Sequence, residues 1–339
     1  MIFTKPEEKK LLTEVLASKP KILITTHANP DGDAIGSMLG LYLSLKKEGY
    51  TVSAISPNEY PDFLSWMPGN EEVKDFTKNR SHARMLIREA DVIFHLDYNE
   101  IKRSGEMAES LAASTAFKVM IDHHPNPQLE TNLSISKTES SSTAELIFEF
   151  LSELFPQPFN KDICECIYTG IMTDTGCFSY SSSRPRLFEI VSKLLAFGIA
   201  KDEIYRNVFD NYSESRMRLL GYCLNDKMQV LPQYNTAFMS LSLEEQQRFN
   251  FTTGDSEGFV NYPLSIKGVR FTALFIERKD RVKISFRSRG SFPANAFSKE
   301  HFGGGGHLNA AGGESSLSLD ETIQKFLALL PNYSEMLNS

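Results

Sequence analysis

Hydrophobic positions in the first two thirds of the chain alternate between short apolar runs and longer stretches with helical spacing. Apolar runs of strand length predict buried strands, and amphipathic stretches of ten or more residues predict helices between them. This alternation implies right-handed crossovers and a mainly parallel, doubly wound α/β sheet, in which ligands bind beyond the carboxyl ends of the strands. The predicted strands are 22–25, 51–56, 91–96 and 117–121, and the predicted helices are 8–18, 34–47, 106–113, 146–154, 162–172 and 187–197.

The remainder of the chain has a different pattern, with strands predominating. We predict a packed loop at 58–79, a long polar connecting helix at 202–224, and then a smaller α/β domain built on a mixed sheet. The predicted domains are therefore 1–198 and 226–339, joined by a helical linker at 199–225. The second domain has predicted strands at 235–241, 268–277 and 282–287, and predicted helices at 243–249 and 320–330.

Composition places the chain among ordinary globular proteins. Its 339 residues favour two domains, and 41% hydrophobic with 23% charged residues is typical of such chains. The first ten residues are charged and no apolar run approaches about twenty residues, so we expect neither a signal peptide nor a membrane span. Four cysteines with no disulfide-like pattern suggest reduced thiols, and we expect the protein in the cytoplasm.

The charge is unevenly distributed along the chain. Residues 226–339 carry twelve basic and twelve acidic side chains, so the whole formal charge of −7 lies in residues 1–225. Within the neutral part, residues 267–289 hold eight basic side chains against two acidic ones. A local basic patch beside an acidic domain suits a small polyanion better than long duplex nucleic acid, which requires a broadly basic face.

The most informative stretch is His27-Ala-Asn-Pro-Asp-Gly-Asp33, which directly follows a predicted buried strand. Its turn residues allow His27, Asp31 and Asp33 to converge, and imidazole beside carboxylate suits Mn, Fe, Co or Zn better than an oxygen-only Mg²⁺ site. Read alone, the stretch is equally consistent with a cap on the next helix, because Asp and Asn are frequent N-cap residues.

Further ligand candidates follow other predicted elements. Asp97 ends one strand, Asp122-His123-His124 ends another, and Asp174 lies in a turn after a helix. With His27, Asp31 and Asp33, these give six groups, enough for two divalent ions that share a bridging carboxylate, and such sites specialise in displacement at phosphorus. Asp97 is the candidate bridge, and Asp122 is expected to orient His123. By contrast, the capping-box pattern at 142–145 is interpreted as structural.

The second domain offers a candidate anion-binding segment, Gly303-Gly-Gly-Gly-His307. Consecutive glycines expose backbone N–H groups and permit positive φ, so such a segment can wrap an anion, although glycine runs are also flexible linkers. Arg287 would add a bidentate grip on phosphate, which makes this domain a candidate clamp for a substrate terminus. Three aromatic residues, Phe292, Phe297 and Tyr262, are candidates for base stacking but read more naturally as core.

Together these motifs resemble those of the DHH phosphoesterases. The stretch 27–37, Asp97, residues 122–124 and 174–176 are similar to the four ordered motifs of that family, and Gly303 to Gly312 is similar to the signature of its associated C-terminal domain. The resemblance implies two metal ions, expected to be Mn²⁺. It assigns His27, Asp31 and Asp97 to one ion and Asp33, Asp97, His123 and Asp174 to the other, with His124 facing the substrate as a catalytic group.

Within that family, the size and the Ser285-x-Arg287-Ser288 element resemble the oligoribonuclease branch, whose members also act as pAp phosphatases. The resemblance implies hydrolysis of short RNA and of linear dinucleotides such as pGpG or pApA, with 3′-phosphate removal from pAp. It implies substrate contacts from Arg103, Arg287, Ser288, Gly305, Gly306 and His307. The sequence departs from the family after Asp97, where Tyr98-Asn99-Glu100 replaces a small hydroxyl residue, and this leaves the role of Arg103 open.

Three other functions stay open. A cyclic-dinucleotide phosphodiesterase would use the same motifs, and so would a manganese pyrophosphatase, although the glycine segment is unlike the basic tail of the latter. A nucleotide-binding sensor without catalysis is the alternative from another class, but every ligand position is filled. We expect small nucleotides and short RNA as partners and no membrane, and self-association into a homodimer is left open.

Overall fold

The computed structural model describes residues 2–338, which form two compact units that meet in sequence between Asn211 and Tyr212. The division between Asn211 and Tyr212 falls inside the segment that we predicted as a linker. That segment is not one long helix. Helix α8 (Lys201–Phe209) ends before Asp210, and α9 (Glu214–Tyr222) begins anew with Ser213 as its N-cap, whose side chain accepts a hydrogen bond from the Arg216 amide.

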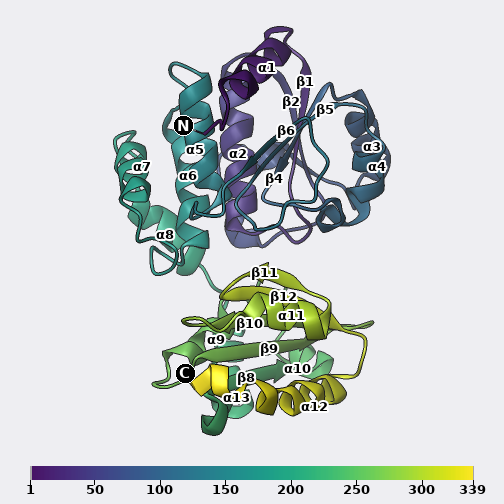
Figure 1. The fold of residues 1–339 in the computed structure, drawn as a ribbon, viewed down its shortest axis with the longest axis vertical. Helices are drawn as coiled ribbons and strands as arrows, with labels where there is room; N and C mark the ends of the chain where they lie inside the picture. The colour runs from purple at the N-terminus through teal and green to yellow at the C-terminus, as the bar shows by residue number, and fades with distance from the viewer. Residues whose placement is uncertain (1, 339) are drawn as a thin grey trace. The chain divides into compact units, whose positions relative to one another are not determined.

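The first unit is built on a six-stranded parallel sheet with the order β3-β2-β1-β4-β5-β6 (Figure 1). This is a doubly wound order, and its direction reverses between β1 and β4, where ligands bind beyond the strand ends. The edge strands β3 and β6 were not predicted, because each is short and carries few apolar residues. The strands are β1 (Lys21–Thr25), β2 (Thr51–Ser56), β3 (Val73–Asp75), β4 (Val92–Leu96), β5 (Phe117–Asp122) and β6 (Leu133–Ser136).

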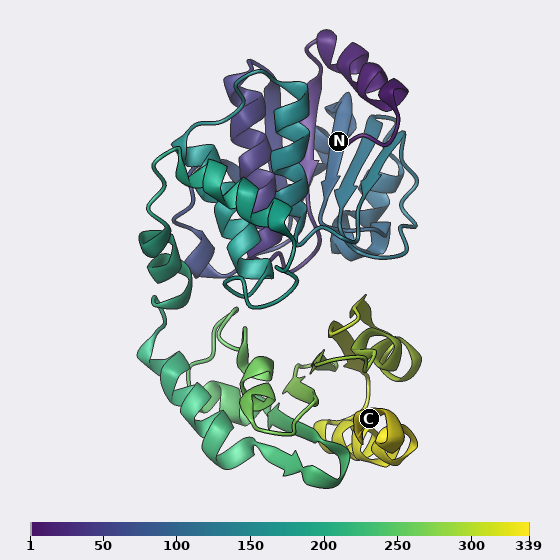
Figure 2. The same ribbon diagram turned by 60° about the vertical axis from the view of Figure 1, so that its left-hand side comes forward.

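Helices cover both faces of this sheet, with α2, α5 and α6 on one side and α3 and α4 on the other (Figures 1 and 2). The expected helix at 106–113 is shorter and follows a 3-10 segment, Ile101–Met107. The helices of the unit are α1 (Pro6–Ala17), α2 (Gly32–Lys47), α3 (Arg80–Glu89), α4 (Ala108–Ala112), α5 (Thr143–Leu154), α6 (Lys161–Asp174), α7 (Pro185–Leu195) and α8, with short 3-10 turns at Asp62–Leu64 and Asn70–Glu72.

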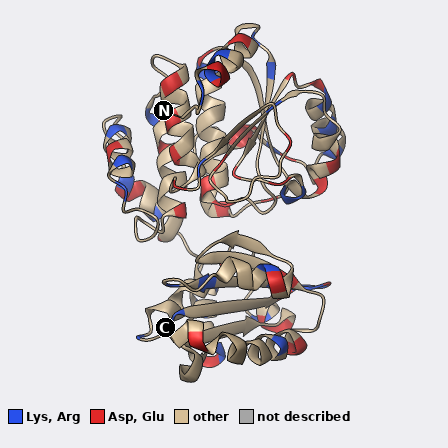
Figure 3. Ribbon diagram, in the orientation of Figure 1, with Lys and Arg blue, Asp and Glu red and all other residues tan. Residues whose placement is uncertain are grey.

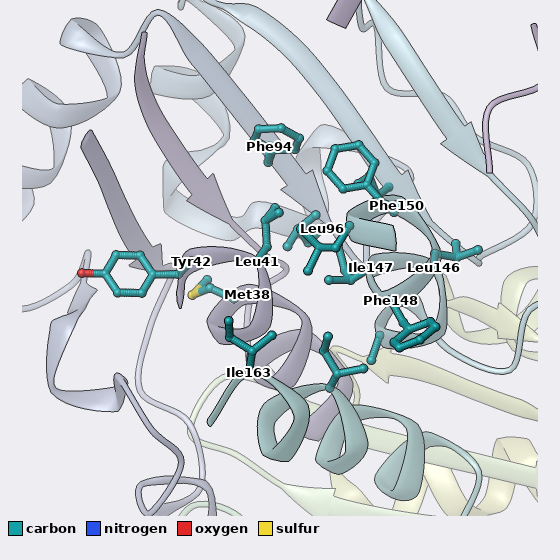
Figure 4. Close-up of a cluster of buried hydrophobic side chains, with 14 of the residues drawn as sticks. Met38, Leu41, Tyr42, Phe94, Leu96, Leu146, Ile147, Phe148, Phe150 and Ile163 are labelled. Atoms are coloured by element: carbon teal, nitrogen blue, oxygen red, sulfur yellow. The ribbon is translucent and has the colours of Figure 1, made fainter. Parts of the chain in front are cut away.

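Successive side chains of the central strands enter two different cores. Phe94 and Leu96 of β4 pack with residues of α2, α5 and α6 (Figure 4), whereas Ile93 packs on the opposite face with residues of α3 and α4. Every residue of β4 is buried, as expected for a parallel strand covered on both faces.

Two glycines allow α2 and α6 to approach closely. A Cβ atom at Gly36 would lie 2.5 Å from the Cys166 carbonyl oxygen, and one at Gly40 would lie 2.7 Å from Ile167. A larger residue at either position would therefore push the two helices apart. This contact matters for function because α2 carries Asp33 at its start and α6 carries Asp174 at its end.

The second unit is a six-stranded mixed sheet with the order β11-β12-β10-β9-β8-β7, in which only the β8–β9 pair is parallel among the described strands. Its strands are β7 (Gln229–Leu231), β8 (Thr236–Leu241), β9 (Phe271–Glu277), β10 (Val282–Ser288), β11 (Gly305–His307) and β12 (Ala310–Ser315). Its helices are α9, α10 (Leu243–Arg248), α11 (Ala294–Phe302), α12 (Leu319–Leu329) and α13 (Ser334–Asn338), with a π-helical turn at Cys223–Lys227 and 3-10 segments at Pro232–Tyr234, Phe259–Ser265 and Leu330–Tyr333.

The fold class predicted from the sequence is confirmed: the chain is α/β, with a parallel sheet in one unit and a mixed sheet in the other. Among residues 2–338, no helix combines the length and the apolar character needed to cross a membrane. Helix α3 carries three arginines and ends at Glu89, whereas the charged residue of α4 is Glu109 (Figure 3).

Candidate metal centre and phosphate-binding face

His27 follows β1 and presents one defined nitrogen to the centre of the first unit. Its Nδ1 lies 2.9 Å from the Ala28 carbonyl oxygen, which can only accept, so Nδ1 carries the proton. Nε2 is then the lone-pair nitrogen, and it lies 3.3 Å from Oδ2 of Asp97 and 4.0 Å from Oδ1 of Asp31. This hydrogen-bonded arrangement is usual for metal-ligating histidines.

The two aspartates at the start of α2 have different surroundings. Asp31 is the N-cap, and its Oδ1 accepts hydrogen bonds from the amides of Asp33 and Ala34, both at 3.0 Å, while half of the side chain remains exposed. The cap interpretation is therefore correct for Asp31, alongside its place near His27. Asp33, in contrast, is only 1% exposed and lies on the inner side of the helix.

Asp97 lies at the centre of the cluster, directly after β4. Its φ of 64° is in the left-handed region, which costs a non-glycine residue about 1 kcal/mol and ends the extended backbone of the strand. Its Oδ2 faces His27 at 3.3 Å, and its Oδ1 faces Nε2 of His123 at 3.6 Å. The two oxygens therefore point to two separate groups of side chains, which is the arrangement that a bridging carboxylate requires.

His123 and Asp174 complete the second group. His123 Nδ1 lies 3.4 Å from the Ser140 carbonyl oxygen, so its Nε2 is again the nitrogen directed at the carboxylates. That atom lies 3.5 Å from Asp174 Oδ2 and 3.8 Å from Asp33 Oδ2. All six residues predicted from the sequence as ligands thus meet at the carboxyl edge of the sheet, in the groups His27–Asp31–Asp97 and Asp33–His123–Asp174, whose ligand atoms lie within 4.8 Å of one another in each group.

The partner of Asp122 differs from our expectation. Asp122 is fully buried, and its Oδ1 lies 2.7 Å from Nδ1 of His124, whereas His123 is held by the Ser140 carbonyl. Asp122 therefore orients His124 rather than His123. This contact leaves Nε2 of His124 as the nitrogen that can serve a substrate.

Protonation in the cluster is governed by burial and by the close opposite charges. Burial opposes the charged form of His27, but Asp97, which accepts a hydrogen bond from Nε2 once that nitrogen is protonated, and the charges of Asp31 and Asp97 outweigh burial and raise the pKa of His27 in the absence of a cation. The pKa of His123 is raised in the same way, against burial, chiefly by Asp174 and Asp97. Asp97 is buried as well, yet the surrounding histidines lower its pKa, whereas burial and neighbouring carboxylates raise the pKa of Asp33 well above its usual range.

These residues fit a pair of divalent cations. Two neutral imidazole nitrogens point inward, each fixed by a carbonyl on its other side, and buried carboxylates face one another with little solvent to screen them. Such carboxylates repel unless protons or cations lie between them. The mixed nitrogen and oxygen donors favour a transition metal such as Mn²⁺ over Mg²⁺.

In the second unit, two predicted substrate residues share one face of the sheet. Arg287 on β10 pairs in register with Ala310 on β12, and Ala310 pairs with His307 on β11, so Arg287 and His307 lie on the same face two strands apart. Strands are spaced about 4.8 Å apart, so the two Cα atoms are separated by about 10 Å. The residue between them, Ala310, is small, and Nη1 of Arg287 donates to the Phe286 carbonyl oxygen at 2.9 Å.

The four glycines do not form the open loop that we predicted. Gly303 ends α11 with a φ of 61°, and Gly305 to His307 form the edge strand β11. A Cβ at Gly304 would lie 1.8 Å from the Gly312 carbonyl oxygen, and one at Gly306 would lie 2.4 Å from the Ala310 oxygen, so both positions require glycine for backbone contact. Gly305 is exposed, has no positive φ and has no atom within 4 Å of an added Cβ, so nothing in the fold requires glycine there.

Two other predicted contacts have different outcomes. Ser288 is buried, and its hydroxyl donates to the Phe292 carbonyl oxygen at 2.7 Å while it accepts from Asn309. The hydroxyl hydrogen of Ser288 is thus engaged within the second unit, and substrate binding by this residue stays a prediction from the sequence. Arg103 lies near the metal cluster, because its carbonyl accepts the Ala28 amide at 2.7 Å and its charge acts on His27.

Comparison with known proteins agrees with this geometry. Residues 21–171 match the DHH family, N-terminal domain, and residues 234–334 match the DHHA1 domain. The bifunctional oligoribonuclease and PAP phosphatase NrnA of Thermus thermophilus is 30% identical over 95% of this chain and 93% of its own length. The chain belongs to the DHH phosphoesterases. It is therefore a hydrolase of phosphoester bonds.

Solved structures extend the comparison. An exopolyphosphatase-related protein from Bacteroides fragilis is 46% identical, with a TM-score of 0.94, and the match covers 99% of this chain and 98% of that one. RecJ of Thermus thermophilus in complex with Mn²⁺ is 13% identical with a TM-score of 0.55; the match covers 99% of this chain and 56% of RecJ, and it shows a common fold only.

One part of the DHH cluster escaped the sequence analysis. The amides of Thr143 and Ala144, in the first turn of α5, donate to the two oxygens of Asp33 at 2.7 and 2.8 Å. The residues at 142–145 had been interpreted only as a helix cap, and Ser142 does cap α5 through the Glu145 amide. The signal that could have indicated more is the run Ser140-Ser-Ser-Thr143, whose small polar side chains suit a helix N-terminus placed against carboxylates.

The three aromatic residues that were candidates for base stacking differ in their exposure. Phe292 and Phe297 are 2% and 1% exposed and pack in the core of the second unit, as the simpler interpretation required. Tyr262 is 45% exposed. Tyr180, which we did not single out, is 47% exposed, and its ring lies against Gly176, two residues after Asp174 in the first unit.

Proposed function

We propose that the chain is a divalent-metal-dependent phosphodiesterase that hydrolyses short oligoribonucleotides and linear dinucleotides such as pGpG and pApA to mononucleotides. Removal of the 3′-phosphate from pAp is the proposed second activity. The observation that carries the proposal is the convergence of His27, Asp33, Asp97 and His123, with Asp31 and Asp174, in a chain that matches an oligoribonuclease over nearly its full length.

Two Mn²⁺ ions are the proposed cofactors. His27, Asp31 and Asp97 would hold one, and Asp33, Asp97, His123 and Asp174 the other. The separate directions of the Asp97 oxygens support this division, and the RecJ complex with Mn²⁺ supports the choice of metal. When bound, such a pair lowers the pKa of a coordinated water and neutralises phosphoryl oxygens.

The proposed roles of the remaining residues follow from their contacts. His124, held through Nδ1 by Asp122, would donate from Nε2 to a phosphoryl oxygen or give a proton to the leaving group. Arg103 would contact phosphate near His27. In the second unit, Arg287, His307 and the backbone at Gly305 and Gly306 would bind a further phosphate.

The substrates follow from the size and charge of these parts. A cluster for one phosphoryl group and a short strand with Lys283 and Arg287 suit a small polyanion, and the formal charge of −7 does not favour long duplex nucleic acid. The exposed ring of Tyr180 near Asp174 is a proposed stacking surface for a base. The cytoplasmic location stays a prediction from the sequence, and self-association into a homodimer stays open.

The test compares pApA, pGpG, pAp, cyclic di-AMP and pyrophosphate at equal concentration with Mn²⁺, followed by end-labelled RNA of two to ten nucleotides. We expect mononucleotides from the linear dinucleotides, adenosine monophosphate from pAp, and faster cleavage of the shortest RNA. Asp97→Ala should remove activity by at least about 10³-fold, because it takes away the charge shared by both metal positions.

Asp62→Ala, in an exposed 3-10 turn, is the matched control and should retain full activity. Preferential cleavage of cyclic di-AMP or pyrophosphate would replace the proposed substrate with one of the alternatives. Nucleotide binding without any hydrolysis would instead favour the sensor.

A further inference from the structure

The first turn of α5 contacts both kinds of proposed metal ligand. Besides the two amide bonds to Asp33, the Thr143 hydroxyl donates to Oδ1 of Asp97 at 2.9 Å. Thr143 hydrogen-bonds both Asp33 and Asp97, through its backbone amide and its side-chain hydroxyl respectively. It therefore connects the proposed bridging carboxylate to a carboxylate of a single metal position.

This connection is rigid because all of its members are buried. Thr143 and Ala144 are fully buried, and Asp33 and Asp97 are 1% and 2% exposed. On the other side, a Cβ at Gly170 would lie 2.6 Å from the Cβ of Ala144 and 3.1 Å from Oδ1 of Asp33, so α6 fits closely against this turn. Thr143 is also β-branched, which restricts its χ1 rotamer.

The Thr143 hydroxyl restricts the terminal torsion of Asp97, which determines where the two carboxylate oxygens point. The terminal torsion of an aspartate has broad energy wells, so its carboxylate plane is set by its contacts. Thr143 binds Oδ1, the oxygen on the His123 side, while Oδ2 faces His27. A carboxylate oxygen has two lone pairs, so Oδ1 can accept from Thr143 and keep the second for a cation.

We propose that Thr143 is a positioning residue that holds the Asp97 carboxylate in its bridging orientation, with one oxygen presented to each metal position. Without the hydroxyl, the carboxylate can rotate and present both oxygens to one position. The other position then loses a ligand. This inference rests on the proposed two-metal function but does not depend on which nucleotide is the substrate.

The test removes the hydroxyl without changing the shape of the side chain. Thr143→Val is nearly isosteric, Thr143→Ser keeps the hydroxyl, and Thr143→Ala is a second deletion variant in case valine does not fold. Ser142→Ala is the matched control, because it removes the α5 cap but leaves Thr143 in place. Full-length proteins are stripped of metal, checked by circular dichroism, and titrated with Mn²⁺ by calorimetry and electron paramagnetic resonance.

We expect the wild type to bind two Mn²⁺ ions and to show the exchange-coupled spectrum of a bridged pair. Thr143→Val or Thr143→Ala should weaken one of the two sites by about 10–100-fold, the usual effect of losing a group that orients a metal ligand, and should reduce the coupled signal. Thr143→Ser should restore both within about threefold. Ser142→Ala should lower the melting temperature of the metal-free protein but leave both Mn²⁺ affinities unchanged.

Several outcomes would overturn the inference. Two Mn²⁺ sites of wild-type affinity in Thr143→Val, with or without a lower melting temperature, would reduce Thr143 to a structural role. A wild type that binds no Mn²⁺ would overturn both this inference and the proposed function. A wild type that binds two ions but cleaves no nucleotide would contradict only the proposed substrate, and the effect of Thr143 on the two affinities would still decide this inference.

Discussion

The metal cluster of the first unit and the glycine-rich segment of the second unit use their residues in different ways. In the cluster, six imidazole and carboxylate groups from four separate places in the chain converge at one sheet edge. In the glycine segment, four consecutive residues serve a helix end at Gly303, backbone contacts at Gly304 and Gly306, and an open position at Gly305.

The difference shows how directly each kind of motif indicates a chemical function. Buried carboxylates that face one another have no purely structural use, since their mutual repulsion costs stability. Glycines do have such uses, because the absence of Cβ allows close backbone approach and positive φ. The cluster therefore points directly to metal chemistry, whereas only Gly305 in the glycine segment has no structural requirement of its own.

The largest expected effect concerns Asp31 and Asp33 at the start of α2. Substituting them tests whether the cluster is divided into two metal positions. Asp33→Asn should reduce activity by about 10³-fold, because the amide group would face the Thr143 and Ala144 donors and weaken a metal position. Asp31→Asn should also lose activity, but asparagine remains a good N-cap, so its melting temperature should stay near that of the wild type.

Metal content by mass spectrometry and thermal unfolding without metal would separate these two variants. Each should lose about one Mn²⁺ per chain, and Asp33→Asn alone should change the stability of the metal-free protein. Equal metal loss from both positions in both variants would break the division of the cluster into two groups.

Substitutions at the adjacent glycines Gly304 and Gly305 should have effects of intermediate size. They test which of the two has a structural role and which is open to the substrate. Gly304→Ala should lower the free energy of unfolding by about 3 kcal/mol, because its Cβ would collide with a backbone oxygen that cannot move aside. Gly305→Ala meets no atom and has no positive φ, so its stability should match that of the wild type while its KM for dinucleotides rises.

Urea unfolding and steady-state kinetics on the two variants provide the measurements. A Gly305→Ala variant with unchanged KM would remove the glycine segment from the substrate site. An equally stable Gly304→Ala would contradict the close contact between β11 and β12.

The smallest effect concerns His95, a buried polar residue on β4 that is not a proposed ligand. Burial lowers its pKa to about 3, and the charge of Lys118 adds to this effect, so the folded state keeps it neutral. The unfolded chain takes up a proton near pH 6.5, so stability falls as the pH drops from about 6.5 toward 3, by up to about 1.4 kcal/mol per pH unit.

His95→Gln removes this titration. Urea unfolding in metal-free buffer between pH 5 and 6.5 should therefore show that the free energy of unfolding of the variant falls less steeply as the pH decreases. The difference between the two slopes should correspond to about one proton. Identical pH slopes for the two proteins would show that His95 becomes protonated in the folded state and that burial does not govern it.

The sequence by itself determined the central architecture and the reactive groups. Short, largely apolar runs such as β1 and β4 are typical of strands covered on both faces, and His27 and Asp97 closely follow these two strands. Because parallel strands end at one edge of the sheet, their ligand chemistry was predictable before their distances were known. The α/β class and the membership of the DHH phosphoesterases followed from the same motifs and are confirmed.

The tertiary structure alone decided which neighbour each polar group meets. Local spacing cannot show that Thr143 reaches Asp33 and Asp97, since those residues are far apart in the chain and meet only when α5 and α2 pack together. Nor can it show that Asp122 holds His124, or that the hydroxyl of Ser288 is already engaged. Hydrogen bonds act over about 3 Å, so they are fixed by the final packing of the elements and not by the pattern that forms them.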